Sequence, residues 1–336
     1  MARKGKHRSR LNIIVALLAL LLISYCVLSS LDEKYDLNIG LPRIDTPSSG
    51  AVYDFIGGLF DGGDVSKDSY DNAMQVMAPA TQGLEVHFID VGQGKSILIR
   101  APGATALIDC GENDQGAKVL SYLKSQKIDS IDVLIATHPH SDHIGGMDTV
   151  IDALDIGRVI MPDIPDDMVP TTKTYTDVLM AIAKKGLKIT PAIPGDAYDL
   201  GSGAVLMVLG PVGEREDLNN ISVIAQLDFG AHAFLFTGDA EEPAEKALLD
   251  SGRDVSCTVL DVGHHGSQTS TSQGFLDAVS PDIAVISCGI DNSYGHPHKE
   301  IGQRLLDSGA EMYRTDLDGH VVVLTDGDAI EVRTQK

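Results

Sequence analysis

Residues 137–146, THPHSDHIGG, constrain the fold more than any other part of the sequence. The apolar run IDVLIAT precedes the cluster and predicts a short buried strand. Two glycines close the stretch and allow the backbone to turn sharply into a following helix. Between the apolar run and the two glycines, three histidines and one aspartate fall within six residues. The sequence therefore predicts a buried strand whose end presents these side chains into one cavity.

The residue types in this turn favour a metal centre. Imidazoles are the usual neutral ligands of zinc-like ions, and a carboxylate adds charge compensation. His138 and His140 lie two residues apart and can face one ion, whereas Asp142 and His143 can face a second ion. A polar surface turn is the alternative, but this spacing directly after a buried strand favours ligands. We expect two divalent ions, zinc in the first instance and manganese as the alternative.

The pattern over residues 82–336 predicts one α/β domain. Strands and helices alternate, with strand pairs at both ends, which indicates a two-sheet core with helices on both outer faces. The segment 176–186 has helical spacing and is expected to close at Gly186. Strands over 222–230 and 232–239 are expected to form a hairpin, and two strands are expected to end the chain.

The first 81 residues differ from the rest of the chain in composition and charge. MARKGKHRSR (1–10) is basic, and the next 21 residues (11–31) carry no charge. At about 1.5 Å per residue their helix would span roughly 31 Å, the thickness of a bilayer core. A cleaved signal peptide is the alternative, but no clean cleavage site follows. We expect a single-pass membrane anchor, a flexible acidic tether over 32–81, and an extracellular C-terminal domain, since the basic flank stays in the cytoplasm.

Charge and cysteine content narrow the partners. The formal charge is −22, and because the first 30 residues contribute +5, the remainder carries −27. Such acidity disfavours nucleic acid as a partner, although a local basic groove could still exist. The four cysteines include no CxxC pair, and Cys26 lies in the apolar run. Buried thiols are therefore expected rather than disulfides or a cysteine zinc site.

HxHxDH after a strand resembles the motif of the metallo-β-lactamase superfamily. HFIDVGQGKSILIR, TALIDCG, LFTGDAE, VGHHGSQTSTS and NSYGHPH appear in the order expected for it. Over residues 83–335 the chain looks most like the extracellular metallo-hydrolase domain of ComEC-type competence proteins and their stand-alone relatives. The resemblance implies an αββα sandwich with the metals at one edge between the two sheets.

The resemblance also implies residue roles. Asp239 matches the carboxylate that bridges two ions, and His264 matches the last metal ligand. His265 would then support the ligands or face the substrate. His296 resembles a position near the substrate, with a capped turn as the alternative. The candidate metal ligands are His138, His140, Asp142, His143, Asp239 and His264; the catalytic candidates are Asp142, His265 and His296; and Asp109, Lys95, Asn220 and Ser267 are expected to support the ligands or contact substrate.

The chain departs from the family pattern in two places. Many members carry a further histidine shortly before the TGD strand, where this chain has Asn219 and Asn220. An amide is a poor zinc ligand, although manganese or magnesium tolerates it, so the first ion is expected to be weakly held or different in kind. ComEC-like proteins usually have an acid in place of Lys95 and a lysine in place of Asp261. We expect these two residues to form a swapped, partly buried ion pair within about 4 Å.

The expected activity follows from these assignments. Two ions about 3.5–4 Å apart lower the pKa of a shared water to near neutrality, and Asp142 can orient that water or take its proton. By resemblance the reaction is phosphodiester hydrolysis in an anionic small molecule or polymer. Nucleic acid and a cell-envelope phosphodiester, such as phosphorylcholine on teichoic acid, are the candidate substrates. The alternatives are a lactone or β-lactam hydrolase and a metal-stabilised module that only binds.

Overall fold

A computed structural model describes residues 83–213 and 217–336. The anchor predicted over 11–31 and the tether predicted over 32–81 lie outside these ranges. Within them, no helix is both long enough and apolar enough to cross a membrane. The described residues are thus those of the predicted α/β domain.

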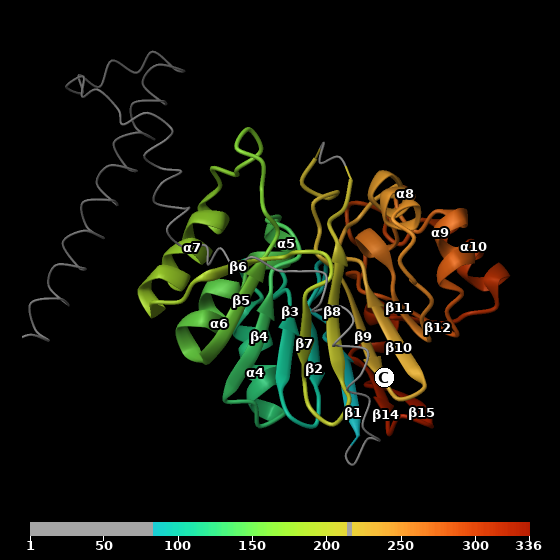
Figure 1. Ribbon diagram of the computed structural model, residues 1–336, viewed down its shortest axis with the longest axis horizontal. Coiled ribbons are helices and arrows are strands. Elements are labelled where there is room, and N and C mark those ends of the chain that lie inside the picture. Colours follow the sequence, from blue (N-terminus) through green and yellow to red (C-terminus); the bar gives the residue numbers. More distant parts are fainter. Residues whose placement is uncertain (1–82, 214–216) are drawn as a thin grey trace, which may run out of the picture. The chain divides into compact units, whose positions relative to one another are not determined.

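Two sheets form the centre of this domain (Figure 1). The first contains β1 (Leu84–Phe88), β2 (Ile97–Arg100), β3 (Thr105–Ile108), β4 (Ser130–Ile135), β5 (Asp155–Met161), β6 (Ile189–Pro191), β14 (Val321–Thr325) and β15 (Ile330–Thr334). Their order is β15-β14-β1-β2-β3-β4-β5-β6. The second contains β7 (Ala197–Asp199), β8 (Val205–Gly210), β9 (Ile224–Phe229), β10 (His232–Phe236), β11 (Val259–Asp261), β12 (Ile283–Ile286) and β13 (Glu311–Arg314). Their order is β13-β12-β11-β10-β9-β8-β7.

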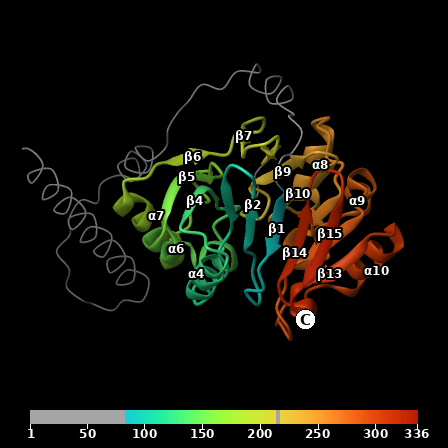
Figure 2. The same ribbon diagram turned by 90° about the horizontal axis from the view of Figure 1, so that it is seen from below.

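Helices cover the outer face of each sheet, as the view from below shows (Figure 2). The first sheet is covered by α4 (Gly116–Ser125), α5 (Ser141–Ile144), α6 (Met147–Ala153) and α7 (Lys173–Lys185). The second is covered by α8 (Glu242–Asp250), α9 (Gln273–Val279) and α10 (Lys299–Ser308), and a short α11 (Thr315–Asp318) precedes β14. This arrangement confirms the αββα sandwich.

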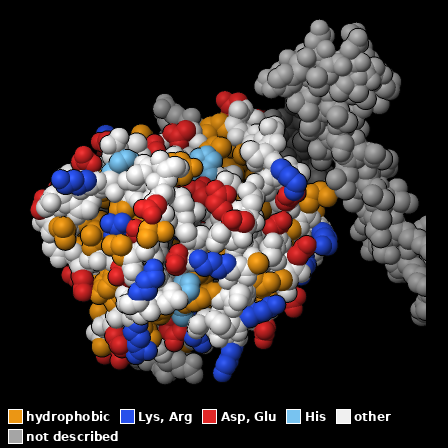
Figure 3. All heavy atoms as spheres, turned by 180° about the vertical axis from the view of Figure 1, so that it is seen from behind, with side chains coloured by type: hydrophobic (Ala, Val, Ile, Leu, Met, Phe, Trp, Pro, Cys, Tyr) orange, Lys and Arg blue, Asp and Glu red, His pale blue; other side chains and the backbone are white. Residues whose placement is uncertain are grey.

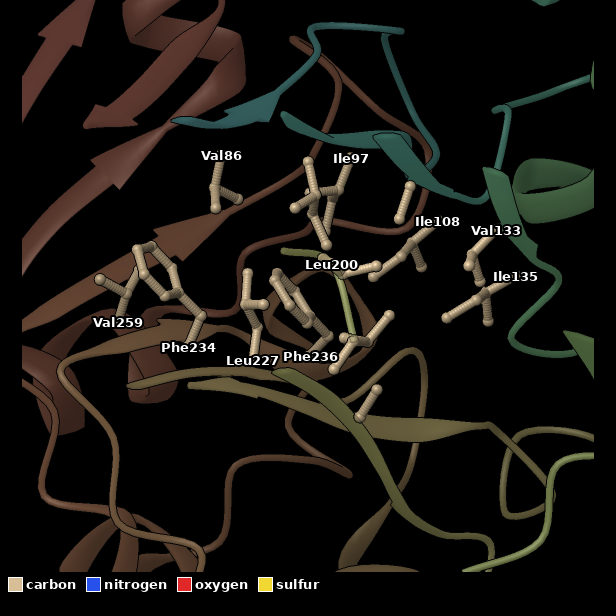
Figure 4. Close-up of a cluster of buried hydrophobic side chains, with 14 of the residues drawn as sticks. Val86, Ile97, Ile108, Val133, Ile135, Leu200, Leu227, Phe234, Phe236 and Val259 are labelled. Atoms are coloured by element: carbon tan, nitrogen blue, oxygen red, sulfur yellow. The ribbon is translucent and has the colours of Figure 1, made fainter. Parts of the chain in front are cut away.

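The main core lies between the two sheets (Figure 4). Val86, Ile97 and Ile108 of the first sheet face Phe234 and Phe236 of the second, and all five are essentially inaccessible to water. Each such side chain contributes roughly 1.5–3 kcal/mol through burial. Two further apolar clusters pack the helices onto the outer faces. Because apolar side chains fill the space between the two sheets, polar functional groups can gather only at the edges of the sandwich.

Several local predictions are confirmed. The helix α7 ends at Gly186, whose φ of 68° is the left-handed conformation that glycine adopts easily. The hairpin between β9 and β10 closes across FGAH, with Phe229 opposite His232. Cys110, Cys257 and Cys288 are buried free thiols. The end of the chain differs from the prediction, because β13 adds a third strand before β14 and β15.

Candidate metal centre

Parallel strands bring the candidate residues to one edge of the sandwich. The HxHxDH turn follows β4, Asp239 follows β10, and a tight turn, η1 (Gly263–Gly266), follows β11. The pairs β3–β4, β10–β11 and β11–β12 are all parallel. Because the carboxyl ends of parallel strands meet at the same edge of a sheet, loops far apart in sequence converge here.

Four side chains form a tight group, Asp142, His143, Asp239 and His265, whose ligand atoms lie within 4.8 Å of one another. His143 Nε2 lies 3.1 Å from Asp239 Oδ1. His265 Nε2 lies 3.2 Å from Asp142 Oδ2 and 3.6 Å from Asp239 Oδ2. Asp239 Oδ1 is buried without a hydrogen-bond partner, which is costly unless a cation compensates it. Two imidazoles and two carboxylates therefore fit a divalent ion.

Both histidines of this group are anchored through the ring nitrogen that faces away from Asp239. His143 Nδ1 donates to Asp109 Oδ2 at 2.6 Å, and His265 Nδ1 donates to the Ser287 carbonyl oxygen at 2.8 Å. Nε2 is then the nitrogen that can face an ion, which is the usual arrangement of metal-binding histidines. Burial acts to lower the pKa of His143, but Asp239 and Asp109 raise it well above its ordinary value, so ion binding there would displace a proton. Asp109 also accepts hydrogen bonds from Thr137, so it supports His143 and the β4 turn together.

His138 and His140 lie next to this group, with the His138 ring centre 4.2 Å from that of His143. His138 Nε2 is 3.0 Å from His140 Nδ1 and 3.9 Å from Asp239 Oδ2. Burial is the largest influence on both rings and holds the pKa of His138 well below its ordinary value and that of His140 below it. Both are therefore neutral at pH 7, the form that binds metal ions.

The structure places both histidines of GHHG beside Asp239, where the resemblance implies a ligand role for His264 and a supporting role for His265. His265 is buried and lies in the tight group, whereas His264 is 21% exposed, with Nε2 3.7 Å from Asp239 Oδ2. The local backbone conformation explains how two adjacent rings can both reach the site. His264 and His265 adopt φ of 49° and 56°, and such left-handed residues cost about 1–3 kcal/mol each unless their surroundings fix them. The turn thereby aims both rings into the site.

The predicted pair of Lys95 and Asp261 is present. Lys95 Nζ lies 2.8 Å from Asp261 Oδ2, and both side chains are completely buried rather than partly so. Nζ also donates to the Gly238 carbonyl at 3.1 Å and the Val262 carbonyl at 3.3 Å. The backbone N–H of Lys95 donates to the Asp142 carbonyl. This one residue thus ties together the three loops that carry the candidate ligands.

The remaining candidates divide between the cavity and its supports. His296 lines the cavity, and burial lowers its pKa to about 4. Asn219 also lines it, with a buried Oδ1 that lacks a hydrogen-bond partner. Asn220 instead holds the loop, accepting from the Glu241 N–H and donating to Asp217. Ser267 is buried and bonds Thr269 Oγ1, beside the cavity.

The cavity in front of these residues has a volume of about 520 Å³, and most of the residues that line it carry a polar side chain. None of the described residues that line it is a lysine or an arginine. On the face turned to the viewer in Figure 3, Lys and Arg side chains lie among Asp and Glu side chains. Sequence reasoning missed several lining residues, of which Gln93 and Tyr294 lie in quoted family motifs: Gln93, Asn113, Thr172, Thr174 and Tyr294.

Comparison with known proteins adds an independent line of evidence. Residues 89–290 match the sequence profile of the Metallo-beta-lactamase superfamily. ComE operon protein 3 of Bacillus subtilis (strain 168) is 30% identical over 255 residues, 70% of this chain and 32% of that protein. Recombination protein 2 of Haemophilus influenzae (strain ATCC 51907 / DSM 11121 / KW20 / Rd) is 31% identical over 256 residues, 74% of this chain and 30% of that protein. The chain thus spans about a third of the length of these relatives.

A solved structure is similar in fold. The CmlA beta-hydroxylase E377D mutant superposes with a TM-score of 0.50 at 14% identity, over 80% of this chain and 61% of its own. At that identity the likeness concerns the arrangement of sheets and helices alone.

Proposed function

Because the chain belongs to the metallo-β-lactamase superfamily, we propose that this metallo-hydrolase is a membrane-anchored, extracellular phosphodiesterase. The observation that carries the proposal is the convergence of five histidines and two aspartates at one edge of the sandwich, where five of the seven line one open cavity: His138, His140, Asp142, His143, Asp239, His264 and His265.

The donor set supports two ions, with zinc first and manganese second. Asp142, His143 and His265 would hold one ion, and His138 and His140 would hold the other, with Asp239 between them. Divalent ions held by these residues would supply a bound water with a pKa of about 7 and would neutralise the charge that develops on phosphoryl oxygens.

The protein's own groups would position the reactants. Burial acts to raise the pKa of Asp142, but His143 and His265 hold it well below its usual range. Asp142 therefore stays ionised and accepts a hydrogen bond from the attacking water, which orients it. His296, neutral at pH 7, can bond a substrate oxygen without adding charge. Amide and hydroxyl groups of the wall, such as those of Gln93 and Thr172, can do the same.

The wall of the cavity also bears on the substrate. Its polar side chains suit a phosphodiester better than the apolar parts of a lactone or β-lactam. The absence of cations among the described lining residues, with a formal charge of −22, disfavours a long polyanion. The resemblance to ComEC-type DNA-uptake proteins favours nucleic acid, and one relative is named Competence protein ComA of Neisseria gonorrhoeae. We prefer an envelope phosphodiester and keep nucleic acid as the second candidate.

The test is turnover by the full chain with zinc, with manganese and with a chelator. Bis-p-nitrophenyl phosphate reports phosphodiesterase activity, and DNA, p-nitrophenylphosphorylcholine, nitrocefin and a simple lactone report the alternatives. We expect metal-dependent cleavage of the phosphodiesters, faster for the choline ester than for DNA. Cleavage of nitrocefin or the lactone alone would contradict the proposed reaction, and metal binding without any turnover would favour the binding module.

The proposed location rests on the basic segment 1–10 followed by the uncharged segment 11–31. Protease added to intact cells should release the domain by cleavage within 32–81. Protection in intact cells, with cleavage only after lysis, would reverse the orientation.

A further inference from the structure

The geometry points to His264 as a ligand of the first ion, together with His138 and His140. Shortly before the TGD strand the chain has Asn219 and Asn220 where the family resemblance implies a further histidine, and His264 would take the place of that histidine. This inference rests on the proposed function only in assuming that ions occupy the centre, and its test measures metal binding. It gives the two histidines of GHHG one ion each.

The group around His265 is already sufficient for its ion. Asp142, His143, Asp239 and His265 provide four ligand atoms within 4.8 Å of one another, and zinc is most often held by four ligands. His264 lies outside that group, with its ring centre 6.2 Å from that of His265. A second histidine from the same turn is therefore free to serve the other ion.

His264 faces Asp239 Oδ2, as His138 does and as His265 does at 3.6 Å. Its Nε2 lies 3.7 Å from Asp239 Oδ2, and His138 Nε2 lies 3.9 Å from that atom. Two ligands that each lie about 2.0–2.2 Å from a shared ion are separated by roughly 3–4 Å. Asp239 Oδ2 thus has, to each of His138 and His264, the spacing expected between two ligands of one ion, and His140 adds a third nitrogen 3.0 Å from His138 Nε2.

The far side of the His264 ring is held as a metal-binding histidine is held. Nδ1 lies 3.1 Å from Glu241 Oε1 and 3.3 Å from Thr269 Oγ1. The Thr269 hydroxyl donates to Glu241, so its oxygen accepts from Nδ1–H. The proton then lies on Nδ1 and the lone pair on Nε2 faces Asp239. The carboxylate of Glu241 supports His264 as Asp109 supports His143.

The asparagine near the missing histidine also takes part. Asn219 Nδ2 donates to Glu241 Oε1 at 3.2 Å. It therefore holds the carboxylate that orients His264, while its own Oδ1 is buried without a hydrogen-bond partner. The chain has an asparagine instead of a histidine before the TGD strand. That asparagine helps, through Glu241, to orient His264, which would supply the ligand in its place.

Metal titration of the full chain tests the inference. Metal-free protein is titrated with Zn²⁺, and with Co²⁺ as a spectroscopic probe, and bound metal per chain is measured by elemental analysis and calorimetry. The wild type should bind two ions. H264N should bind one, with the affinity of the remaining ion unchanged. Asparagine tolerates the left-handed backbone at this position, and circular dichroism checks the fold.

Glu241→Gln provides a second arm that leaves the ligand in place. It should still bind two ions but hold one of them about 10–100-fold more weakly, the usual cost of losing a partner behind a ligand. His298→Asn is the matched control, since His298 is a nearby histidine whose Nδ1 accepts from the Gln268 N–H. It should bind both ions as the wild type does.

Two ions with unchanged affinities in H264N would overturn the inference, and so would a single ion in the wild type. These outcomes are separable from failure of the proposed function. A wild type that binds two ions but cleaves no phosphodiester contradicts the function and leaves the ligand assignment standing. An H264N variant that keeps both ions yet loses turnover contradicts the assignment and leaves the function standing.

Discussion

Removing the Lys95 side chain alone should cost more stability than removing Lys95 and Asp261 together. The two groups lie 2.8 Å apart and both are completely buried. Burial raises the pKa of Asp261, and Lys95 acts against that rise. In Lys95→Ala the carboxyl group keeps its burial and loses its cation. Breaking a buried pair by removing one partner costs about 3–5 kcal/mol.

The double variant separates the cost of an unpaired Asp261 carboxyl group from the cost of the lost Lys95 hydrogen bonds. Lys95 Nζ also donates to the carbonyl groups of Gly238 and Val262, and each lost hydrogen bond costs about 1 kcal/mol in either variant. Only the single variant adds an unpaired acid. At about 2–4 °C per kcal/mol for a domain of this size, the acid lowers the unfolding temperature by roughly 6–20 °C in that variant and not in the double one.

The assay is thermal and urea unfolding of the full chain, followed by circular dichroism between pH 5 and pH 8. With its pKa raised above the unfolded value of about 3.9, Asp261 in Lys95→Ala binds a proton more tightly when folded. Stability is then greatest at low pH and is lost as pH rises, so the deficit should be smaller at pH 5 than at pH 8. Lys173→Ala, which breaks an exposed pair with Asp177, is the control and should change nothing measurable. A single variant as stable as the double variant across this range would refute the reasoning.

Three further outcomes are expected. His140→Ala should lower phosphodiester turnover by orders of magnitude with an unchanged circular dichroism spectrum, and undiminished turnover would end the claim of metal-dependent hydrolysis. Chelation should lower the unfolding temperature, because ions bind the native centre; at 100 times the Kd the loss is about 2.7 kcal/mol, whereas an unchanged temperature would mean that no ion binds. His87 is buried, and burial is the main cause of its lowered pKa. Below its ordinary pKa of about 6.5 the unfolded chain binds a proton that the folded one does not, so stability should fall from pH 7 to pH 5 with a shallower slope in His87→Gln; equal slopes would show that His87 does not contribute.

The fold could be predicted where local pattern and burial agree. The apolar strands β4, β8 and β10 and the amphipathic helix α7 are clear in the sequence because each buries a whole face or stripe. The short strands β6 and β7 have three residues each and are partly exposed, so they show no period. The edge strand β13, EMYR, is also at least partly exposed throughout. Its pairing with β12 is set by the sheet rather than by its own residues.

The same distinction applies to the metal centre. The HxHxDH turn is local, so its spacing alone indicates the chemistry. Lys95 and Asp261 lie 166 residues apart in the sequence. Their pairing could still be predicted, because the two residues depart from the family pattern with opposite changes of charge. No sequence pattern indicates which of His264 and His265 enters the tight group. Their positions depend on two consecutive left-handed residues and on Glu241, one of two adjacent acids after TGD. Which acid meets which ring is decided by three loops meeting at one edge, and only the folded chain brings those loops together.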